Sequence, residues 1–594
     1  MTSTRRWIAA TVAGLTGIGT FVVAELPAGA ASMVVVNGAT TYQKIDGFGV
    51  SEAFGQANAI RNLAAGPRQQ ALDMLFDTSS GAGFSILRNL IPADTANTIE
   101  PNAPASPSAT PTYVWNGAGD STDQGQLWLA KQAKTYGVTF YNDAWSAPGF
   151  MKTNGSDANG GSLCGTPGAT CGTGDWRQAY ANYLTQHAKF WASAGVTPAY
   201  VGFVNEPSFK TSYSSMDVTP AQAADFVKYL GPALKNSGLA TRAACCDTLG
   251  FNQLPGYVSA IRADSTANAD VAAFTSHGYS GAPTAPVATD GRPLWESEWA
   301  INGSTWNTSW DDGSTASGLT WAQQIHTGLT AANLTAFLYW WGISNTSHDS
   351  SLIGLSGSTL TASKRYYALL GYSRFIRPGA VRISASSGDS SLLTSAYRNT
   401  DGSVVIVAIN TAGSATPATY SLTSTTTGTV TPYLTNSGNS AAAQPGIALA
   451  GGSFTSTVPA RSEVTYRITG GTTPPTTTPA TTTPTTPPTT PSTGPSTCTA
   501  TYQVVNSWQD GFQTTVTVTN PTTAPITGWT VSWTTPSGQS ITQLWNGALS
   551  TSGSTVTVRN ASWNGTIAPG AGTTFGFTGA GPSTPTPTPA CTSP

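Results

Sequence analysis

Two glutamates that end short apolar segments have the residue type and the setting for acid–base chemistry. Glu206 lies near the end of the run AYVGFVNEP (199–207), and Glu298 near the end of PLWESEWA (293–300). Hydrolysis of a glycosidic bond needs one carboxylic acid to protonate the leaving oxygen and one carboxylate to meet the electron-poor sugar carbon. If two such groups lie about 5–5.5 Å apart, the carboxylate acts as a nucleophile and the anomeric configuration is retained. The pair therefore predicts glycoside hydrolysis.

Two neighbouring residues bear on the same chemistry. Glu296 precedes Glu298 by two positions, so in a strand both side chains point to one face and alternation cannot choose between them as the nucleophile. Asn205, directly before Glu206, could donate a hydrogen bond to a sugar 2-hydroxyl, an interaction that strengthens in the transition state.

The main body of the chain carries eight short apolar runs that end in polar or aromatic residues. Amphipathic segments such as 176–195 and 219–238 separate most of them, with apolar residues three and four positions apart. Strands that alternate eight times with helices predict an α/β fold, a closed (β/α)8 barrel, with a doubly wound sheet as the alternative. Polar residues at the strand ends favour the barrel, because barrel active sites form there. The runs are 45–50, 84–89, 138–146, 199–207, 241–247, 272–279, 293–300 and 336–342.

The first 31 residues have the features of a secretion signal. Arg5 and Arg6 precede an apolar run from about residue 7 to 24, and Ala28-Gly29-Ala30 supplies small residues for cleavage. We therefore expect a secreted, extracellular protein in which disulfides can form, exported by the general or the twin-arginine route. A membrane anchor is the alternative.

Composition shifts predict the remaining boundaries. Residues 32–378 form the predicted barrel, and residues 379–470 change to short Val/Thr/Tyr strands typical of a side β-sandwich, which the strand-like segment 33–45 could join. Residues 471–497 are almost wholly Thr and Pro and predict an extended linker. Residues 498–594 then form a second, separate β-sandwich module.

Charge and composition exclude several classes of partner. The net charge is −2 and only 9% of the 594 residues are charged, which argues against nucleic acid or a membrane surface. Four His and no spaced CxxC pairs leave little to bind a metal, so we expect no metal and no cofactor. A weakly charged chain with 18 Trp and 20 Tyr suits a neutral carbohydrate.

The six cysteines predict two disulfides. Cys164 and Cys171 bracket a short Gly/Pro turn, and Cys498 and Cys591 lie at the two ends of the C-terminal module, so each pair is expected to bond. The adjacent Cys245 and Cys246 are expected to be buried thiols, with a vicinal bond as the alternative.

The tryptophans of the C-terminal module divide into two groups. Trp508, Trp545 and Trp563 each stand beside Gly, Asn or Gln, as in SWQDGF, LWNG and SWNG, which indicates surface platforms rather than core. Trp529 and Trp533 alternate with Val531 on one strand and could pack inward.

From about residue 45 to 381 the chain resembles glycoside hydrolase family 30, in particular its fungal-type xylanase branch. The motifs GFGVSEAF, SGAGFSILRN, WSAPGFMKTNG, GFVNEP, SHGY and SRFIRPGAVRI carry the likeness. The resemblance implies that Glu206 is the acid/base and Glu298 the nucleophile, with Glu296 behind it. It also implies a side β-sandwich and the substrate-pocket residues Arg88, Trp145, Asn205, His277, Tyr279 and Trp340.

One position departs from the resemblance. Relatives that read a glucuronate branch carry an Arg in the loop after SEAF, whereas Gln56 stands there in this sequence. A neutral amide cannot pair bidentately with a carboxylate, so we expect an enzyme that does not depend strictly on glucuronosyl branches.

The C-terminal module resembles carbohydrate-binding module family 2. Its three tryptophans, Trp508, Trp545 and Trp563, match the pattern of members that bind crystalline cellulose. The whole chain is thus expected to be a secreted, monomeric, retaining β-1,4-xylanase of endo or exo action, held on cellulose. The alternatives are the same fold acting on a β-1,6-glucan, a β-1,6-galactan or a glucosylceramide-like glycoside, or a non-catalytic cell-wall adhesin.

Overall fold

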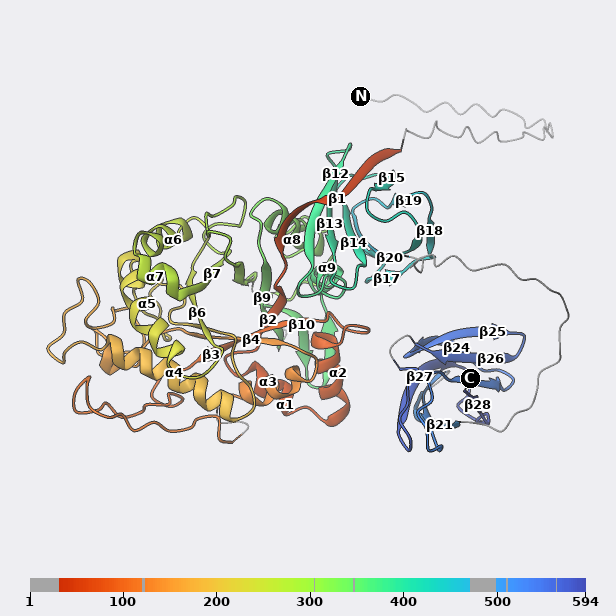
Figure 1. Cartoon of the computed structure of the whole chain (residues 1–594), viewed down its shortest axis with the longest axis horizontal. Coiled ribbons are helices and arrows are strands. Elements are labelled where there is room, and N and C mark those ends of the chain that lie inside the picture. Colours follow the sequence, from red (N-terminus) through yellow and green to blue (C-terminus); the bar gives the residue numbers. More distant parts are fainter. Residues whose placement is uncertain are drawn as a thin grey trace, which may run out of the picture. The chain divides into compact units, whose positions relative to one another are not determined.

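A computed structural model describes residues 31–119, 123–303, 305–345, 348–470, 498–508, 511–561 and 564–593. The predicted linker and all but the last residue of the predicted signal peptide lie outside these residues. The chain divides into two compact units, Met1–Pro474 and Pro475–Pro594, each described here by itself (Figure 1). No helix among these described residues has the length and apolar character needed to span a membrane.

Eight parallel strands form a closed barrel in the first unit (Figure 1). They pair in chain order, and β9 pairs with both β8 and β2 to close the ring, which confirms the predicted barrel over the doubly wound sheet. Two further strands, β10 (Ser351–Ser356) and β11 (Thr359–Ala362), extend the sheet beyond β9. The barrel strands are β2 (Gly47–Ser51), β3 (Ile86–Ile91), β4 (Thr139–Ala144), β5 (Tyr200–Gly202), β6 (Arg242–Thr248), β7 (Val271–His277), β8 (Leu294–Trp299) and β9 (Ala336–Asn345).

Helices lie outside the barrel strands. The amphipathic segments predicted from their periodicity are α4 and α5. Helix α5 begins at a capping box in which Thr219 and Gln222 satisfy each other's backbone N–H groups, with Pro220 at the first helical position. The helices are α1 (Gln56–Arg61), α2 (Ala65–Phe76), α3 (Gln126–Lys134), α4 (Arg177–Ser193), α5 (Pro220–Lys235), α6 (Leu254–Ala263), α7 (Ser265–Asp270), α8 (Gly318–Thr330) and α9 (Lys364–Ser373), with a 3-10 turn at Gly149–Met151.

A second sheet of ten strands makes the side β-sandwich of the same unit. The N-terminal strand β1 (Ser32–Lys44) belongs to it, because β1 pairs antiparallel with β12 and parallel with β15. Its core includes the stacked rings of Tyr420 and Phe454, whose centroids are 4.5 Å apart. The other strands are β12 (Val381–Ser387), β13 (Leu392–Arg398), β14 (Val404–Asn410), β15 (Thr416–Leu422), β16 (Gly428–Thr435), β17 (Ala442–Ala443), β18 (Ile447–Leu449), β19 (Ser453–Val458) and β20 (Ser462–Gly470).

The second unit is a β-sandwich of two four-stranded sheets. Trp529 and Trp533 are buried in its core and stack on Phe575 and Phe577, which confirms their predicted inward packing. The side chains of Trp508 and Trp545, and the whole of Trp563, lie outside the described part, so the cellulose platform stays a prediction. The strands are β21 (Thr499–Trp508), β22 (Gly511–Thr519), β23 (Thr530–Thr534), β24 (Ser540–Trp545), β25 (Gly547–Ser552), β26 (Thr555–Asn560), β27 (Gly572–Ala580) and β28 (Ala590–Thr592).

All six cysteines form disulfides. Cys164 bonds Cys171, and Cys498 bonds Cys591. Cys245 and Cys246 are bonded to each other, so the expectation of two buried thiols is wrong. The peptide bond between them is cis and their Cα atoms lie 3.0 Å apart, which brings the two side chains together.

The disulfide of the second unit gives a prediction for stability. It closes a loop of sequence separation 93, and such a cross-link stabilises mainly by restricting the unfolded chain. We expect replacement of Cys498 and Cys591 by Ser to lower the unfolding free energy of this unit by about 4 kcal/mol. Urea unfolding of the wild-type and double-Ser chains would measure it. A transition in the second unit that does not move would contradict the loop-closure argument.

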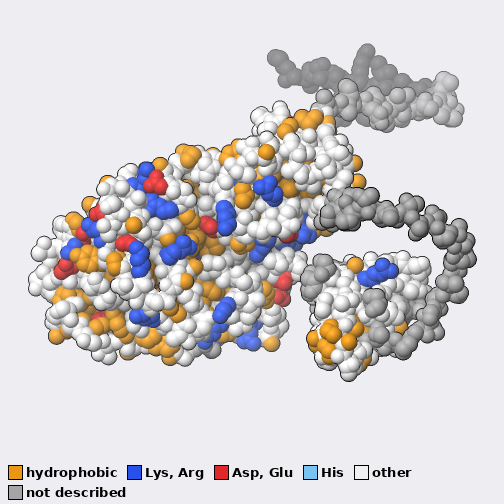
Figure 2. All heavy atoms as spheres, in the orientation of Figure 1, with side chains coloured by type: hydrophobic (Ala, Val, Ile, Leu, Met, Phe, Trp, Pro, Cys, Tyr) orange, Lys and Arg blue, Asp and Glu red, His pale blue; other side chains and the backbone are white. Residues whose placement is uncertain are grey.

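Charged side chains are sparse on the face of the molecule seen in Figure 2, where uncharged atoms dominate both units. This agrees with a chain in which 9% of the residues are charged.

Candidate active site

The carboxyl ends of the barrel strands surround a cavity of about 550 Å³. Side chains from the ends of strands β4, β5, β7, β8 and β9 reach it, as expected for a barrel whose chemistry sits at this end. The lining residues are Phe54, Trp145, Asn205, Glu206, Phe209, Tyr213, Leu249, Tyr279, Glu298, Asn302, Trp340 and Trp341.

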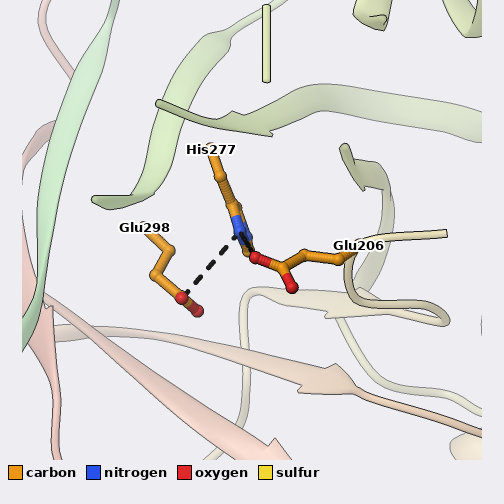
Figure 3. Close-up of side chains that lie close together, drawn as sticks. All are labelled: Glu206, His277 and Glu298. Atoms are coloured by element: carbon orange, nitrogen blue, oxygen red, sulfur yellow. Dashed lines mark hydrogen bonds and ion pairs between the residues drawn. The ribbon is translucent and has the colours of Figure 1, made fainter. Parts of the chain in front are cut away.

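Glu206 and Glu298 face each other across the floor of this cavity, with His277 between them (Figure 3). Nδ1 of His277 lies 3.1 Å from Oε1 of Glu206 and 3.9 Å from Oε1 of Glu298. One oxygen of each carboxylate and a ring nitrogen of His277 all lie within 4.8 Å of one another. Carboxylate oxygens this close to each other fit the closely set pair of retaining glycosidases better than the wider pair of inverting ones.

The backbone holds Glu206 in an uncommon conformation. Glu206 has φ 47° and Asp247 has φ 43°. Both values lie in the left-handed region that residues other than Gly rarely adopt. The N–H of Glu206 donates to the carbonyl of Asp247 at 2.8 Å, so the two residues support each other across neighbouring strand ends. Such conformations persist at functional sites where the surrounding structure fixes them.

Arg88 lies beneath the cavity and carries no exposed surface. Its guanidinium bonds Glu298, and its Nη2 donates to Asp143 and Asp247, each at 2.9 Å. The same Nη2 donates to Oδ1 of Asn205 at 2.7 Å, which leaves the amide nitrogen of Asn205 as its donor toward the cavity. Arg88 thus orients Glu298 and Asn205 from below.

The two aspartates around Arg88 differ in their ionisation. Burial, with the nearby Asp247, raises the pKa of Asp143 well above its usual value. Burial is the largest influence on the pKa of Asp247 and acts to raise it, but the Arg88 charge, the hydrogen bonds with Asp143 and Ser297 and the nearby His277 together outweigh it, and the pKa is lowered. Asp247 is therefore the ionised partner of Arg88, and it accepts hydrogen bonds from the hydroxyls of Tyr141 and Ser297 at 2.7 Å and 2.5 Å.

Glu298 is a buried carboxylate held by three donors or cations. Burial raises its pKa, while His277, Arg88 and a hydrogen bond from the Tyr279 hydroxyl at 2.9 Å act to lower it. Glu296 lies behind it, fully buried, and its Oε1 accepts the backbone N–H of Glu298 at 3.2 Å. Burial raises the pKa of Glu296 well above its usual value, which favours the protonated form of this residue.

His277 is buried and lies close enough to several carboxylates for their charges to affect its pKa. Burial alone would lower its pKa, but Glu298, Glu206 and Asp247 outweigh that effect and raise it. The raised pKa favours the protonated ring of His277, the form that would stabilise negative charge on the glutamates beside it.

Aromatic rings form the wall of the cavity. Trp145 and Trp340 lie 5.8 Å apart between ring centroids, and Phe54 meets Trp145 edge-on at 5.6 Å. Trp341 stacks on Trp340 at 5.2 Å. Flat apolar faces of this kind suit the C–H faces of sugar rings, while the floor supplies the polar groups.

The structure brings most of the predicted site residues together. Trp145, Asn205, Tyr279 and Trp340 line the cavity with the two glutamates. Arg88 and His277 are fully buried and do not line it, but they contact the glutamates that do. Gln56 does not line it either. The chain turns into α1 at this residue, and Phe54 of the same loop faces the cavity instead.

Several functional residues were not predicted. Asp143 lies near the end of the apolar run 138–146 and Asp247 ends the run 241–247, so the strand-end reasoning that found Glu206 could have found them. Phe54, Phe209, Tyr213, Leu249, Asn302 and Trp341 line the cavity from loops or a strand end. The loop residues have no periodicity that would mark them.

A closed barrel with a close pair of buried carboxylates at its carboxyl end, walled by aromatic rings, defines a glycoside hydrolase. Three family models match the chain. Residues 31–278 match O-Glycosyl hydrolase family 30, residues 379–466 match the Glycosyl hydrolase family 30 beta sandwich domain, and residues 498–593 match the Cellulose binding domain.

Known proteins agree with the family models. The catalytic domain of GH30 xylanase C from Talaromyces cellulolyticus is 44% identical, with a TM-score of 0.70, over 74% of this chain and 100% of that one. The Aspergillus fumigatus endo-1,6-beta-D-glucanase neg1 is 24% identical over 62% of this chain and 79% of its own. Endoglucanase A of Thermobispora bispora is 54% identical over 82 residues, only 14% of this chain and 18% of its own. The chain belongs to glycoside hydrolase family 30 and carries a cellulose-binding module.

Proposed function

We propose that this glycoside hydrolase is a secreted, retaining β-1,4-xylanase. The observation that carries the proposal is the carboxylate pair with oxygens within 4.8 Å on the floor of an aromatic-walled cavity. The 44% identity to xylanase C supports xylan as the substrate, and the cellulose-binding module and the disulfides are compatible with work outside the cell on plant cell wall. Membership of a hydrolase family speaks against the non-catalytic adhesin.

The reaction runs in two displacements. In the first, Glu298 attacks the anomeric carbon, and the glycosidic oxygen leaves with the proton of Glu206, which gives a covalent glycosyl–Glu298 ester. In the second, a water gives its proton to Glu206 and its oxygen displaces Glu298 from the same carbon. Two inversions retain the configuration.

The buried groups assist each step. Arg88 and Tyr279 hold Glu298 in place by hydrogen bonds, so its attacking oxygen is oriented before substrate arrives. The amide of Asn205, fixed by Arg88, is the donor for the sugar 2-hydroxyl. His277 lies at hydrogen-bond distance from Glu206, the group that changes its protonation twice in each turnover.

The proposal includes tolerance of unbranched chains. Among the described residues that line the cavity there is no Lys or Arg, and the guanidinium of Arg88 is committed to buried carboxylates below it. A glucuronate branch would therefore find no free cation in the lining. The lack of a lining cation supports this tolerance, whereas Gln56 does not line the cavity and does not bear on it.

A β-1,6-glucan is the second candidate substrate, because the relative neg1 is an endo-1,6-beta-glucanase. One assay separates the candidates: the mature enzyme is placed on glucuronoxylan, unbranched β-1,4-xylan and β-1,6-glucan side by side, and the products are sized by mass spectrometry over time. We expect comparable ladders of short xylo-oligomers from both xylans. Cleavage of glucuronoxylan alone would contradict branch tolerance. Cleavage of the glucan alone would replace xylan as the substrate.

A further inference from the structure

A second cavity lies on the outer side of the barrel and shares no residue with the catalytic one. It measures about 630 Å³, a size typical of ligand-binding clefts. The loop that follows β3 forms one wall, and the start of α4 with the residues before it forms the other. We name it the loop–α4 groove, lined by Glu100, Pro104, Pro107, Ser108, Ala109, Thr110, Pro111, Tyr113, Gly174, Asp175, Gln178, Ala179 and Asn182.

Glu100 is the unusual residue of the loop–α4 groove. Its side chain lines the groove, yet the residue is only 2% exposed, and its Oε2 has no hydrogen-bond partner among the described residues. Buried polar groups in folded proteins are nearly always hydrogen-bonded, so an unpartnered carboxyl oxygen calls for a donor that the chain does not supply. Oε2 is itself closed off from solvent, so a molecule in the groove would meet this carboxyl at its other oxygen.

The charged residues in and near the groove argue against an ionic ligand. The two acidic residues of the lining, Glu100 and Asp175, disfavour an anion, and the nearby cation Arg177 is already bonded to Asp175 and Asp225. A metal ion does not fit either. Among the described residues, the group of three or more potential ligands close enough to hold one is in the catalytic cavity, not here.

The rest of the lining suits a neutral, hydroxyl-rich chain. Gln178 and Asn182 lie one turn apart on one face of α4, and Nε2 of Gln178 donates to Oδ1 of Asn182 at 3.0 Å. The amide nitrogen of Asn182 and the amide oxygen of Gln178 are the groups that this pair offers to a ligand. Tyr113 and the prolines of the loop offer flat apolar surface for the C–H faces of sugar rings. Burial raises the pKa of Glu100 to about 7, so near neutrality part of the population carries a carboxylic acid that can both donate to and accept from hydroxyls.

We propose that the loop–α4 groove is a second, non-catalytic binding site for a stretch of neutral β-glycan chain. The choice of xylan as that glycan rests on the function proposed above, whereas the existence of a sugar site rests on the groove alone. A site of this kind would keep the barrel on a polymer between cleavages without touching the bond that is cut.

Hydrogen exchange on the full chain tests the proposal directly. Xylohexaose is added to the Glu298→Gln variant, in which it is not consumed, and amide exchange is followed by mass spectrometry. We expect protection in two separate places: residues 205–213 of the catalytic cavity, and residues 100–113 with 174–182 of the groove. Titration of the oligomer gives an affinity for each place.

A matched pair of variants separates the groove from its surroundings. Asn182→Trp, at an exposed helix position, places an indole in the groove and should weaken groove binding at least about tenfold while cavity protection remains. Lys189→Trp, two turns further on the same helix and outside the lining, should leave both unchanged.

The outcomes distinguish the two proposals. Protection of the cavity without the groove, or groove protection that Asn182→Trp does not weaken, would overturn the second site and leave the xylanase proposal standing. If xylohexaose protects neither place, a β-1,6-gluco-oligosaccharide is used instead. Protection of both places would then keep the groove as a glycan site and replace xylan, and an unprotected groove with both oligomers would overturn the inference.

Discussion

Replacement of Glu298 by Gln is expected to abolish hydrolysis of xylan while the chain stays folded. Glu298 is the carboxylate that bonds Arg88 and Tyr279 at the cavity floor, and an amide there cannot form the covalent intermediate. Loss of general acid–base help alone costs roughly 10²–10⁴-fold in rate, and loss of the nucleophile removes the whole two-step route, so the drop should exceed that range. Initial rates on xylan and unfolding curves of both chains give the measurement.

Glu296→Gln is the matched control, because it removes a second buried carboxyl two residues away on the same strand face. Its pKa is raised well above the usual value by burial, so the protonated acid that it replaces has nearly the shape of an amide. We expect a loss of less than about tenfold in kcat/KM, or about 1.4 kcal/mol. A 2-fluoro xyloside that traps the intermediate should label Glu298. A label on Glu296, or an active Glu298→Gln enzyme, would contradict the assignment.

The barrel could be predicted because its signal is periodic. Eight apolar runs, each ending in polar or aromatic residues, correspond to strands β2 to β9. The same strand-end pattern drew attention to Glu206 and Glu298, since the carboxyl ends of parallel barrel strands meet over one mouth. These predictions needed only the order of the elements and a closed ring.

The position of each side chain relative to the cavity, lining it or buried below it, was not predictable in the same way. Arg88 was expected in the substrate pocket, but whether a strand-end cation reaches the cavity or lies below it depends on which carboxylates surround it, and Asp143 and Asp247 come from two other strands. Gln56 was interpreted from its place in a motif, yet α1 starts at this residue and it does not line the cavity. Loop aromatics such as Tyr213 depend on chain geometry that no local pattern encodes.

Removal of the buried cation Arg88 is expected to have the second large effect, on stability. Arg88→Ala should lower the unfolding free energy of the first unit by about 3–5 kcal/mol, because it leaves Asp247 and Glu298 buried without their cation. Arg262→Ala is the control: it breaks a salt bridge of 2.7 Å to Asp290 in which both side chains are about two-fifths exposed, and should cost about 0–1 kcal/mol. Urea unfolding followed by tryptophan fluorescence measures both.

Arg88→Lys tests what the cation does for catalysis, because it keeps a charge but lacks the guanidinium group that bonds Asp143, Asp247 and Glu298 together. Burial raises the pKa of Glu298 and Arg88 opposes that rise, so a weaker cation leaves the pKa higher. The nucleophile must be ionised, and the acidic limb of kcat/KM reports this ionisation in the free enzyme. We therefore expect that limb to move to higher pH, with a lower plateau. A limb that stays in place would mean that Arg88 supports the barrel without tuning Glu298.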